Sequence, residues 1–215
     1  MLFNLSEQNS IANQFVAELR DLTIQKDRLR FRKNVERLGQ IMAYEISKKL
    51  VYRQRSIETP LGTSDTSLMQ ASPILITVMR AGIPYFQGFV DFFDKSDCGF
   101  IGAYRKEDGK DDVAISLEYL AAPSIENREV ILIDPMLATG HSFVRSAQAL
   151  TKHGKPSHLY IASLVSAPDG ISYIAANVKT EHSIWTCAVD ERLNEQFYIV
   201  PGLGDAGDLC FGPKM

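Results

Sequence analysis

Residues 129–142 read Glu-Val-Ile-Leu-Ile-Asp-Pro-Met-Leu-Ala-Thr-Gly-His-Ser. The apolar run Val130–Ile133 predicts a buried strand, Asp134 stands at its end, and small residues then form a turn that opens a helix. Such a turn leaves backbone N–H groups unpaired at the positive end of a helix dipole, where a phosphate binds well. The carboxylate of Asp134 would repel a phosphate but accept hydrogen bonds from hydroxyls. The stretch therefore fits a sugar phosphate better than a bare anion.

The alternative for this stretch is an ordinary strand-to-helix turn in which Thr139 or Ser142 caps the helix. A capped turn, however, does not require Thr, Gly and Ser together behind an acid. We therefore favour the phosphate site.

Strands and helices alternate on both sides of this stretch. Strands that are apolar on both faces and alternate with helices predict an α/β fold with a mainly parallel central sheet flanked by helices. Ligands of such sheets bind beyond the carboxyl ends of the strands, so Arg80-Ala81-Gly82 and the turn after Asp134 are expected to line one cleft. The predicted strands are 74–79, 99–104, 113–119, 130–133, 159–165 and 184–189, and the predicted helices run after Gly82 to about 93, from 143 to about 152 with Gly154 as cap, and from 169 to about 177.

The two ends of the chain differ from this core. Residues 11 to about 50 are predicted to be helical, a connection starts at 57–62, and the tail after Asp190 is glycine-rich without a periodic pattern. We predict one domain over residues 1–215, with an N-terminal helical part to about residue 70, a core at about 71–190 and a tail at 191–215. The helical prediction rests on apolar residues at helical spacing, which are Ile11, Phe15, Leu19, Leu22, Val35, Leu38, Met42, Ile46 and Leu50.

Composition narrows the class of protein. The chain has 215 residues, 45% of them hydrophobic, and a net charge of −3, which makes nucleic-acid binding unlikely. The basic cluster 26–37 is interpreted as a solvated helix face, with an RNA-binding surface as the alternative. No apolar run is long enough to span a bilayer, and residues 1–5 lead directly into polar residues, so we expect no membrane contact and no signal peptide. The three cysteines lack metal-type pairing, which favours idle thiols in a reducing cytoplasm and no metal site.

Three motifs resemble those of the uracil phosphoribosyltransferases, a family of type I phosphoribosyltransferases. The first, Asp134–Gly140, is similar to the signature for 5-phosphoribosyl-1-diphosphate (PRPP), in the version where proline replaces the second acid. The second, Arg80-Ala81-Gly82, is similar to the diphosphate loop, although alone it is equally compatible with a structural turn. The third, which comprises Asp190–Glu195 and Tyr198–Asp208, is similar to the uracil-binding loop, the alternative being a flexible tail. The resemblance covers most of the chain, including 42–45 and 57–61.

The resemblance implies a type I phosphoribosyltransferase fold with a small hood made by the N-terminal helices and the C-terminal tail. It implies transfer of the phosphoribosyl group from PRPP to uracil, giving UMP and diphosphate, with Mg²⁺ chelated by the diphosphate, in a homodimer or larger homo-oligomer. Catalytic roles are implied for Arg80, Arg105, Asp134 and Asp205. The residues implied to bind PRPP are Arg80, Ala81, Gly82, Arg105, Asp134, Pro135, Met136, Leu137, Ala138, Thr139, Gly140, His141, Ser142 and Asp205, and those implied to contact uracil are Ile199, Gly204, Asp205 and Ala206.

A glycine-rich loop suits a flat base because its main chain can lie edge-on to the ring. A backbone N–H aimed at O4 of uracil would face another donor in cytosine, so such a site rejects the wrong base. Arg105 has a simpler interpretation as a surface cation at a strand end.

The chain also departs from the family pattern. His141 stands where the family has glycine, the hairpin within 106–123 lacks the usual Tyr-Tyr and Lys, and Leu209-Cys210 replaces a basic-aliphatic pair. Two alternatives follow. One is a regulator of the same fold that binds RNA with UMP or PRPP as effector, which the negative net charge argues against. The other is an inactive homologue that only binds ligand.

Overall fold

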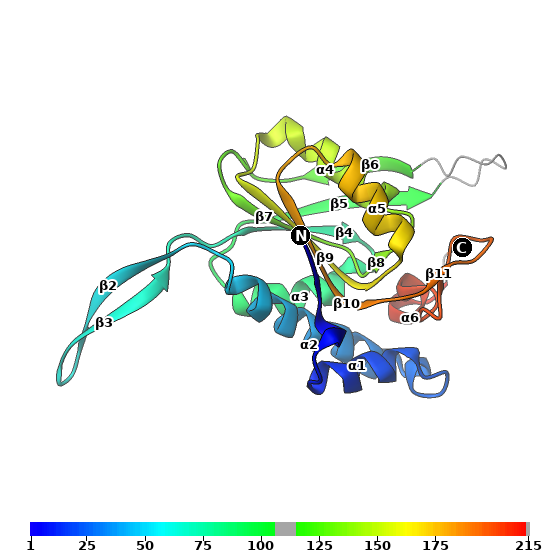
Figure 1. Cartoon of the computed structure of the whole chain (residues 1–215), viewed down its shortest axis with the longest axis horizontal. Helices are drawn as coiled ribbons and strands as arrows, with labels where there is room; N and C mark the ends of the chain where they lie inside the picture. Colours follow the sequence, from blue (N-terminus) through cyan, green and yellow to red (C-terminus); the bar gives the residue numbers. More distant parts are fainter. Residues whose placement is uncertain (106–114, 214–215) are drawn as a thin grey trace.

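The computed structural model describes the backbone of residues 1–105 and 115–213, and their side chains except for 103–105 and 115–118. Within this part, a central sheet has the strand order β1-β10-β9-β7-β4-β5-β6, with β8 paired to β9 (Figure 1). All neighbours are parallel except β5 and β6, which confirms the predicted mainly parallel α/β sheet. The strands are β1 (Leu2–Asn4), β4 (Ile74–Met79), β5 (Cys98–Arg105), β6 (Ile115–Ala121), β7 (Glu129–Ile133), β8 (Met136–Leu137), β9 (His158–Ser166) and β10 (His182–Val189).

Helices cover both faces of the sheet (Figure 1). The α2 helix (Arg28–Ser47) and α3 helix (Gly82–Phe92) pack on one face, while α4 (His141–Leu150) and α5 (Pro168–Asn177) pack on the other. Successive strand side chains point to opposite faces, so Leu75 joins the first core and Ile74 the second. Burial on both faces explains why the strands are apolar throughout.

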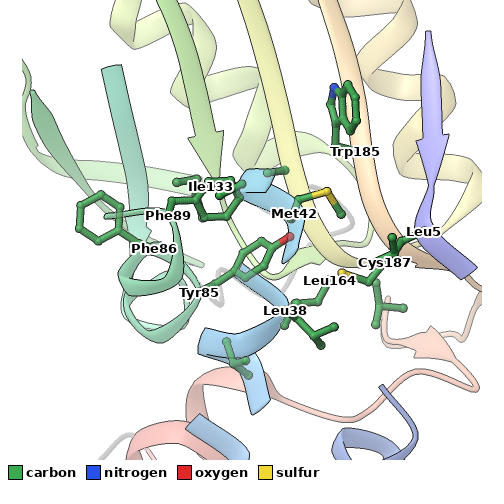
Figure 2. Packing of buried hydrophobic residues seen from close by; sticks show 14 of the residues in the cluster. Leu5, Leu38, Met42, Tyr85, Phe86, Phe89, Ile133, Leu164, Trp185 and Cys187 are labelled. Carbon is green, nitrogen blue, oxygen red and sulfur yellow. The ribbon is translucent and has the colours of Figure 1, made fainter. Parts of the chain in front are cut away.

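The core under α2 and α3 contains the largest buried side chains. Leu38 and Met42 of α2 and Tyr85 of α3 are fully buried, in the same core as Ile133 and Trp185 of the sheet (Figure 2). Tyr85 also donates its hydroxyl to the carbonyl oxygen of Ser163 at 3.1 Å, so its one polar atom is satisfied. This core fixes the position of α3, whose first residue is Gly82 of the predicted site.

The N-terminal segment is only partly as predicted. The helical stretch is broken into α1 (Ile11–Arg20) and α2, with a short 3-10 turn at Ile24–Lys26 between them. Ile11 and Leu22, two of the residues at helical spacing, are 62% and 77% exposed. Leu22 lies beyond the end of α1, where the helical spacing no longer applies. The β1 strand, which was not predicted, pairs with β10 at the sheet edge.

Residues 52–69 form an antiparallel hairpin of β2 (Tyr52–Thr59) and β3 (Gly62–Met69), so the helical part does not extend to residue 70. The hairpin projects far from the sheet (Figure 1), and every residue of β2 is exposed. The expected break at 57–62 is its tip. Because neither strand has a buried face, neither carries the alternating apolar pattern that reveals a strand.

The C-terminal tail is ordered rather than merely glycine-rich. It contains β11 (Arg192–Leu193), β12 (Ile199–Val200) and α6 (Ala206–Phe211). Arg32 of α2 donates to the carbonyl oxygen of Cys210 at 2.8 Å, at the negative end of α6. The tail and the N-terminal helices thus lie together, as expected for the hood. None of the helices found in the described ranges is long and apolar enough to cross a membrane.

Candidate functional site

The predicted phosphate and diphosphate loops lie at the same edge of the sheet. The β4 strand is paired with both β5 and β7, and all three are parallel. The loop Arg80–Gly82 follows β4, Asp134 follows β7, and Arg105 is the last residue of β5. The carboxyl ends of three adjacent strands therefore carry these groups, as the sequence predicts. The side chain of Arg105 and the turn 106–110 lie outside the described residues.

Close packing fixes the diphosphate loop. A Cβ atom on Gly82 would collide with Oγ1 of Thr77 and lie 3.3 Å from the carbonyl oxygen of Ile133. Only glycine therefore lets α3 begin this close to the ends of β4 and β7. No side chain caps α3 at Ala81. The N–H of Ile83 donates to the carbonyl oxygen of Arg80 at 3.2 Å, so an anion would be bound by the N–H groups that precede it.

Arg80 has one nitrogen satisfied and one that is not. Its Nη2 atom lies 3.3 Å from Oδ1 of Asp208 and 3.4 Å from the carbonyl oxygen of Gly212, both in the tail. Its Nε atom is buried and has no hydrogen-bond partner among the residues that the structure describes. A buried donor without an acceptor is costly, and an anionic ligand would remove that cost.

The phosphate loop ends at Gly140, whose φ of +83° is in the left-handed region that glycine favours. The α4 helix starts directly after it, and no side chain caps it at that residue. The turn is therefore not the capped turn considered as the alternative. A Cβ on Gly170 of α5 would collide with the carbonyl oxygen of Ala138, so α5 supports the loop from outside.

His141 is the first residue of α4 and stacks on Tyr173 of α5, with ring centroids 4.3 Å apart. Its Nδ1 atom is buried and has no hydrogen-bond partner in the described part of the chain. The structure thus accommodates a histidine at this position by packing its ring on α5.

Asp134 is held by β9 and by its own loop. Its backbone N–H donates to the carbonyl oxygen of Ala162 at 3.1 Å, and its Oδ1 accepts the N–H of Met136 at 3.3 Å. The residues between the acid and Gly140 include β8, which pairs with β9. The carboxylate is therefore fixed where the strand ends, beside the phosphate loop.

The tail reaches the diphosphate loop. A Cβ on Gly207 would lie 3.9 Å from both Cβ of Ala81 and Nη2 of Arg80. Ile199 and Ala206 are only 5% and 3% exposed and belong to the core, whereas Gly204 is exposed. Asp205 is exposed and caps α6 by accepting the N–H of Asp208 at 2.9 Å.

The residues that attach the tail, including Arg20, Asp190 and Asp208, were not predicted from the sequence. Their contacts join positions far apart in the chain, and no local spacing reveals them. A hollow of about 370 Å³ lies at the opposite edge of the sheet, at the amino ends of β7 and β9, near Arg128 and His158. None of the predicted site residues lines it.

The chain is similar to known proteins over its whole length. The family model described as uracil phosphoribosyltransferase matches residues 6–213. A uracil phosphoribosyltransferase of Porphyromonas gingivalis is 44% identical over 214 residues, covering 100% of this chain and 99% of that protein. A uracil phosphoribosyltransferase of Thermococcus gammatolerans is 35% identical over 212 residues, covering 97% and 92%.

Solved structures show the same fold. The structure of the AQ2163 protein from Aquifex aeolicus has a TM-score of 0.87 and 27% identity, covering 99% of this chain and 98% of that one. A hypoxanthine phosphoribosyltransferase from Staphylococcus aureus has a TM-score of 0.50 and 13% identity, covering 75% and 76%. At that identity the second likeness concerns the fold alone.

Proposed function

The chain belongs to the uracil phosphoribosyltransferase family, and from this premise we propose how its own residues carry out the reaction. The enzyme transfers the phosphoribosyl group of PRPP to uracil, which yields UMP and diphosphate in pyrimidine salvage. The assignment of residues rests on one observation, namely that three segments far apart in the sequence lie together at one edge of the sheet. These are Arg80–Gly82, Asp134–Ser142 and the tail around Gly207.

The diphosphate is the leaving group, and we assign its binding to Arg80, Arg105 and the amides of Ala81 and Gly82. Negative charge grows on the diphosphate as its bond to C1 of the ribose loosens. Donors that are already in place stabilise that charge without reorganisation. The buried, unpartnered Nε of Arg80 supports this role.

The ribose 5′-phosphate is assigned to the backbone N–H groups and hydroxyls of residues 138–142, with Asp134 accepting the ribose hydroxyls. Residues 135–137 connect these two parts of the PRPP site. Holding the sugar at both ends keeps C1 in position while it acquires oxocarbenium character and the base nitrogen approaches. No covalent protein nucleophile is needed, and we assign no general base.

Uracil is assigned to the main chain at Ile199, Gly204 and Ala206, with Asp205 touching both the base and PRPP. The conformation of Gly204 supports this assignment. Its φ is +95°, and a Cβ placed on it would have only a methyl of Leu209 within 4 Å. The backbone there is open to a flat ligand. Main-chain donors facing O4 would select uracil over cytosine.

Mg²⁺ is proposed to enter with PRPP. Within the part of the chain that the structure describes, no three His, Cys, Asp or Glu side chains are grouped to hold a metal ion. An ion at this site would therefore take most of its oxygen ligands from the diphosphate and water, as Mg²⁺ does with nucleotide phosphates. When bound, it would neutralise charge on the leaving diphosphate.

The test of the proposed reaction is direct. Purified enzyme with PRPP, Mg²⁺ and labelled uracil is expected to form labelled UMP, while labelled cytosine forms no CMP above background. Omitting Mg²⁺ or PRPP is expected to abolish the product. Binding of PRPP without formation of UMP would indicate an inactive homologue instead.

The contacts of the basic cluster argue against the RNA-binding alternative. The basic cluster is largely exposed, as expected, but its arginines make contacts inside the molecule. Arg30 pairs with Glu18, Arg32 binds the carbonyl of Cys210, and Arg37 lies over the ring of Phe15 at 5.2 Å. These contacts explain the cluster as a connection between α1, α2 and the tail.

We further propose a cytoplasmic homo-oligomer. The three cysteines are free, and burial raises the pKa of the Cys187 and Cys210 thiols to about 12, which keeps both protonated and unreactive. The β2–β3 hairpin supports self-association. An isolated two-stranded hairpin is only marginally stable in water. This one also exposes apolar side chains, including Leu61 at 100%, which a second copy of the chain would cover.

Shortening the hairpin is expected to yield a monomer. Replacing residues 54–67 with a two-residue Asn-Gly turn keeps the base of the hairpin, where Arg53 pairs with Leu68. The molar mass from light scattering should fall from an oligomer to one chain. Leu61→Asp should weaken association in the same assay, whereas Leu22→Asp, at a site 77% exposed on another surface, should not. A wild-type protein that is already monomeric would refute the proposal.

A further inference from the structure

A buried ion pair connects helix α1 to the tail. Arg20, the last residue of α1, donates from Nη2 to Oδ1 of Asp190 at 2.7 Å and from Nη1 to Oδ2 at 2.9 Å. The carboxylate side chain is 6% exposed and the guanidinium side chain 23%. The pair is therefore two-pronged and largely withdrawn from water, the geometry in which such pairs are strongest and most directional.

Both members of the pair also hold Gly202. The N–H of Gly202 donates to Oδ2 of Asp190 at 2.8 Å, and Nη1 of Arg20 donates to the carbonyl oxygen of Gly202 at 3.3 Å. Gly202 has a φ of +61° and stands between β12 and Gly204. The backbone at the start of the base loop is thus clamped on both its donor and its acceptor.

This clamp, formed by Arg20 and Asp190, attaches the base loop to the sheet. Asp190 directly follows β10, and its N–H donates to the carbonyl oxygen of Ser166 at the end of β9 at 2.8 Å. The N–H of Glu191 donates to the carbonyl oxygen of Val200 at 3.1 Å, just before the clamped residue. The position of residues 202–206 is therefore fixed by the same edge of the sheet that carries the PRPP loops.

Stability alone is a poor reason for such a pair. The free energy lost by removing two charges from water is about as large as the free energy gained from their attraction. Proteins in which a buried ion pair is replaced by apolar side chains are therefore often equally stable. This pair, however, holds a loop whose main chain must face the base. Its burial therefore favours a role in positioning that loop. We propose that Arg20 and Asp190 are positioning residues for uracil, setting the place of residues 202–206. This inference rests on the proposed assignment of that loop to the base.

The experiment compares the Michaelis constants for the two substrates. Asp190→Asn keeps an acceptor for Gly202 but loses the charge, and Arg20→Ala removes the whole fork. Each is expected to raise KM for uracil about tenfold or more, the effect of losing one hydrogen bond to a charged group. KM for PRPP should rise much less, because Asp205 alone among the residues assigned to PRPP lies within 202–206 and the others follow other strands. Arg20→Lys keeps the charge without the fork and should recover only part of the loss.

A second ion pair on the same helix provides the matched control. Glu18 of α1 is bound by Nε and Nη2 of Arg30 at 2.8 and 2.9 Å. The hydrogen bond from Arg30 is the main reason that the pKa of Glu18 is lowered to about 2, so the pair is ionised at neutral pH. It attaches α1 to α2 and not to the tail. Arg30→Ala should therefore leave both Michaelis constants unchanged even if it lowers the melting temperature.

Three outcomes would overturn the inference. These are an unchanged KM for uracil in Arg20→Ala, an equal rise of both constants, or the same rise in Arg30→Ala. Gly204→Val tests the premise separately, since a branched side chain is strained at its φ of +95°. If Gly204→Val raises KM for uracil and Arg20→Ala does not, the clamp is refuted and the loop assignment stands. If neither variant has an effect, both fail. Should Arg20→Ala unfold, Asp190→Asn decides.

Discussion

Replacing Arg80 with alanine is expected to lower kcat by about 10²–10³-fold, the cost of removing one preorganised donor from developing negative charge. The guanidinium lies at the carboxyl end of β4 and carries a buried Nε that nothing in the described chain satisfies. Steady-state turnover with saturating PRPP and uracil measures the effect. Circular dichroism and the melting temperature should show that the variant remains folded.

Arg80 also touches the tail, so the loss of turnover needs a control for that contact. Asp208 pairs with Arg80 at 3.3 Å, and both side chains are about 40% exposed, at 39% and 41%. A half-exposed pair of this kind contributes up to about 1 kcal/mol, so Asp208→Ala should change kcat by no more than about fivefold. Equal losses in Arg80→Ala and Asp208→Ala would mean that Arg80 acts by holding α6 and not on the diphosphate.

Asp134→Asn is expected to lower kcat/KM for PRPP by about 10- to 150-fold, which corresponds to about 1.5–3 kcal/mol for hydrogen bonds to a charged group. Asparagine has the size of aspartate and retains an oxygen for the N–H of Met136, so the loop keeps its shape. What disappears is the negative charge beside the ribose. That charge would bind the hydroxyls and stabilise the positive character that C1 gains in the transition state.

The matching control removes a carboxylate elsewhere. Asp94 is exposed and follows α3 on the surface, and Asp94→Asn should leave kcat/KM for PRPP unchanged. A fall in KM for PRPP alone, or kinetics like those of the wild type in Asp134→Asn, would contradict the assigned role. Comparing kcat with kcat/KM separates binding of the ribose from stabilisation of the transition state.

The sequence was sufficient for most of the central sheet and for the positions of the turns at 80–82 and 134–142. Buried parallel strands are apolar throughout, so β4, β7, β9 and β10 are visible as continuous runs. The small residues and the acid that follow such strands are equally local signals. The hairpin at 52–69 was missed because neither of its strands has a buried face and thus a pattern. The strand β1 was missed because its three residues are too few to show one.

What the sequence alone determined about this protein is which groups stand at the ends of its strands: Arg80 after β4, Asp134 after β7 and Gly140 before α4. These follow from short-range rules of burial and turn geometry. Only the tertiary structure decided that Gly207 lies against Ala81 and that Arg20 and Asp190 clamp Gly202. Such contacts join residues up to 182 positions apart, and they depend on how whole elements pack, which no local spacing encodes.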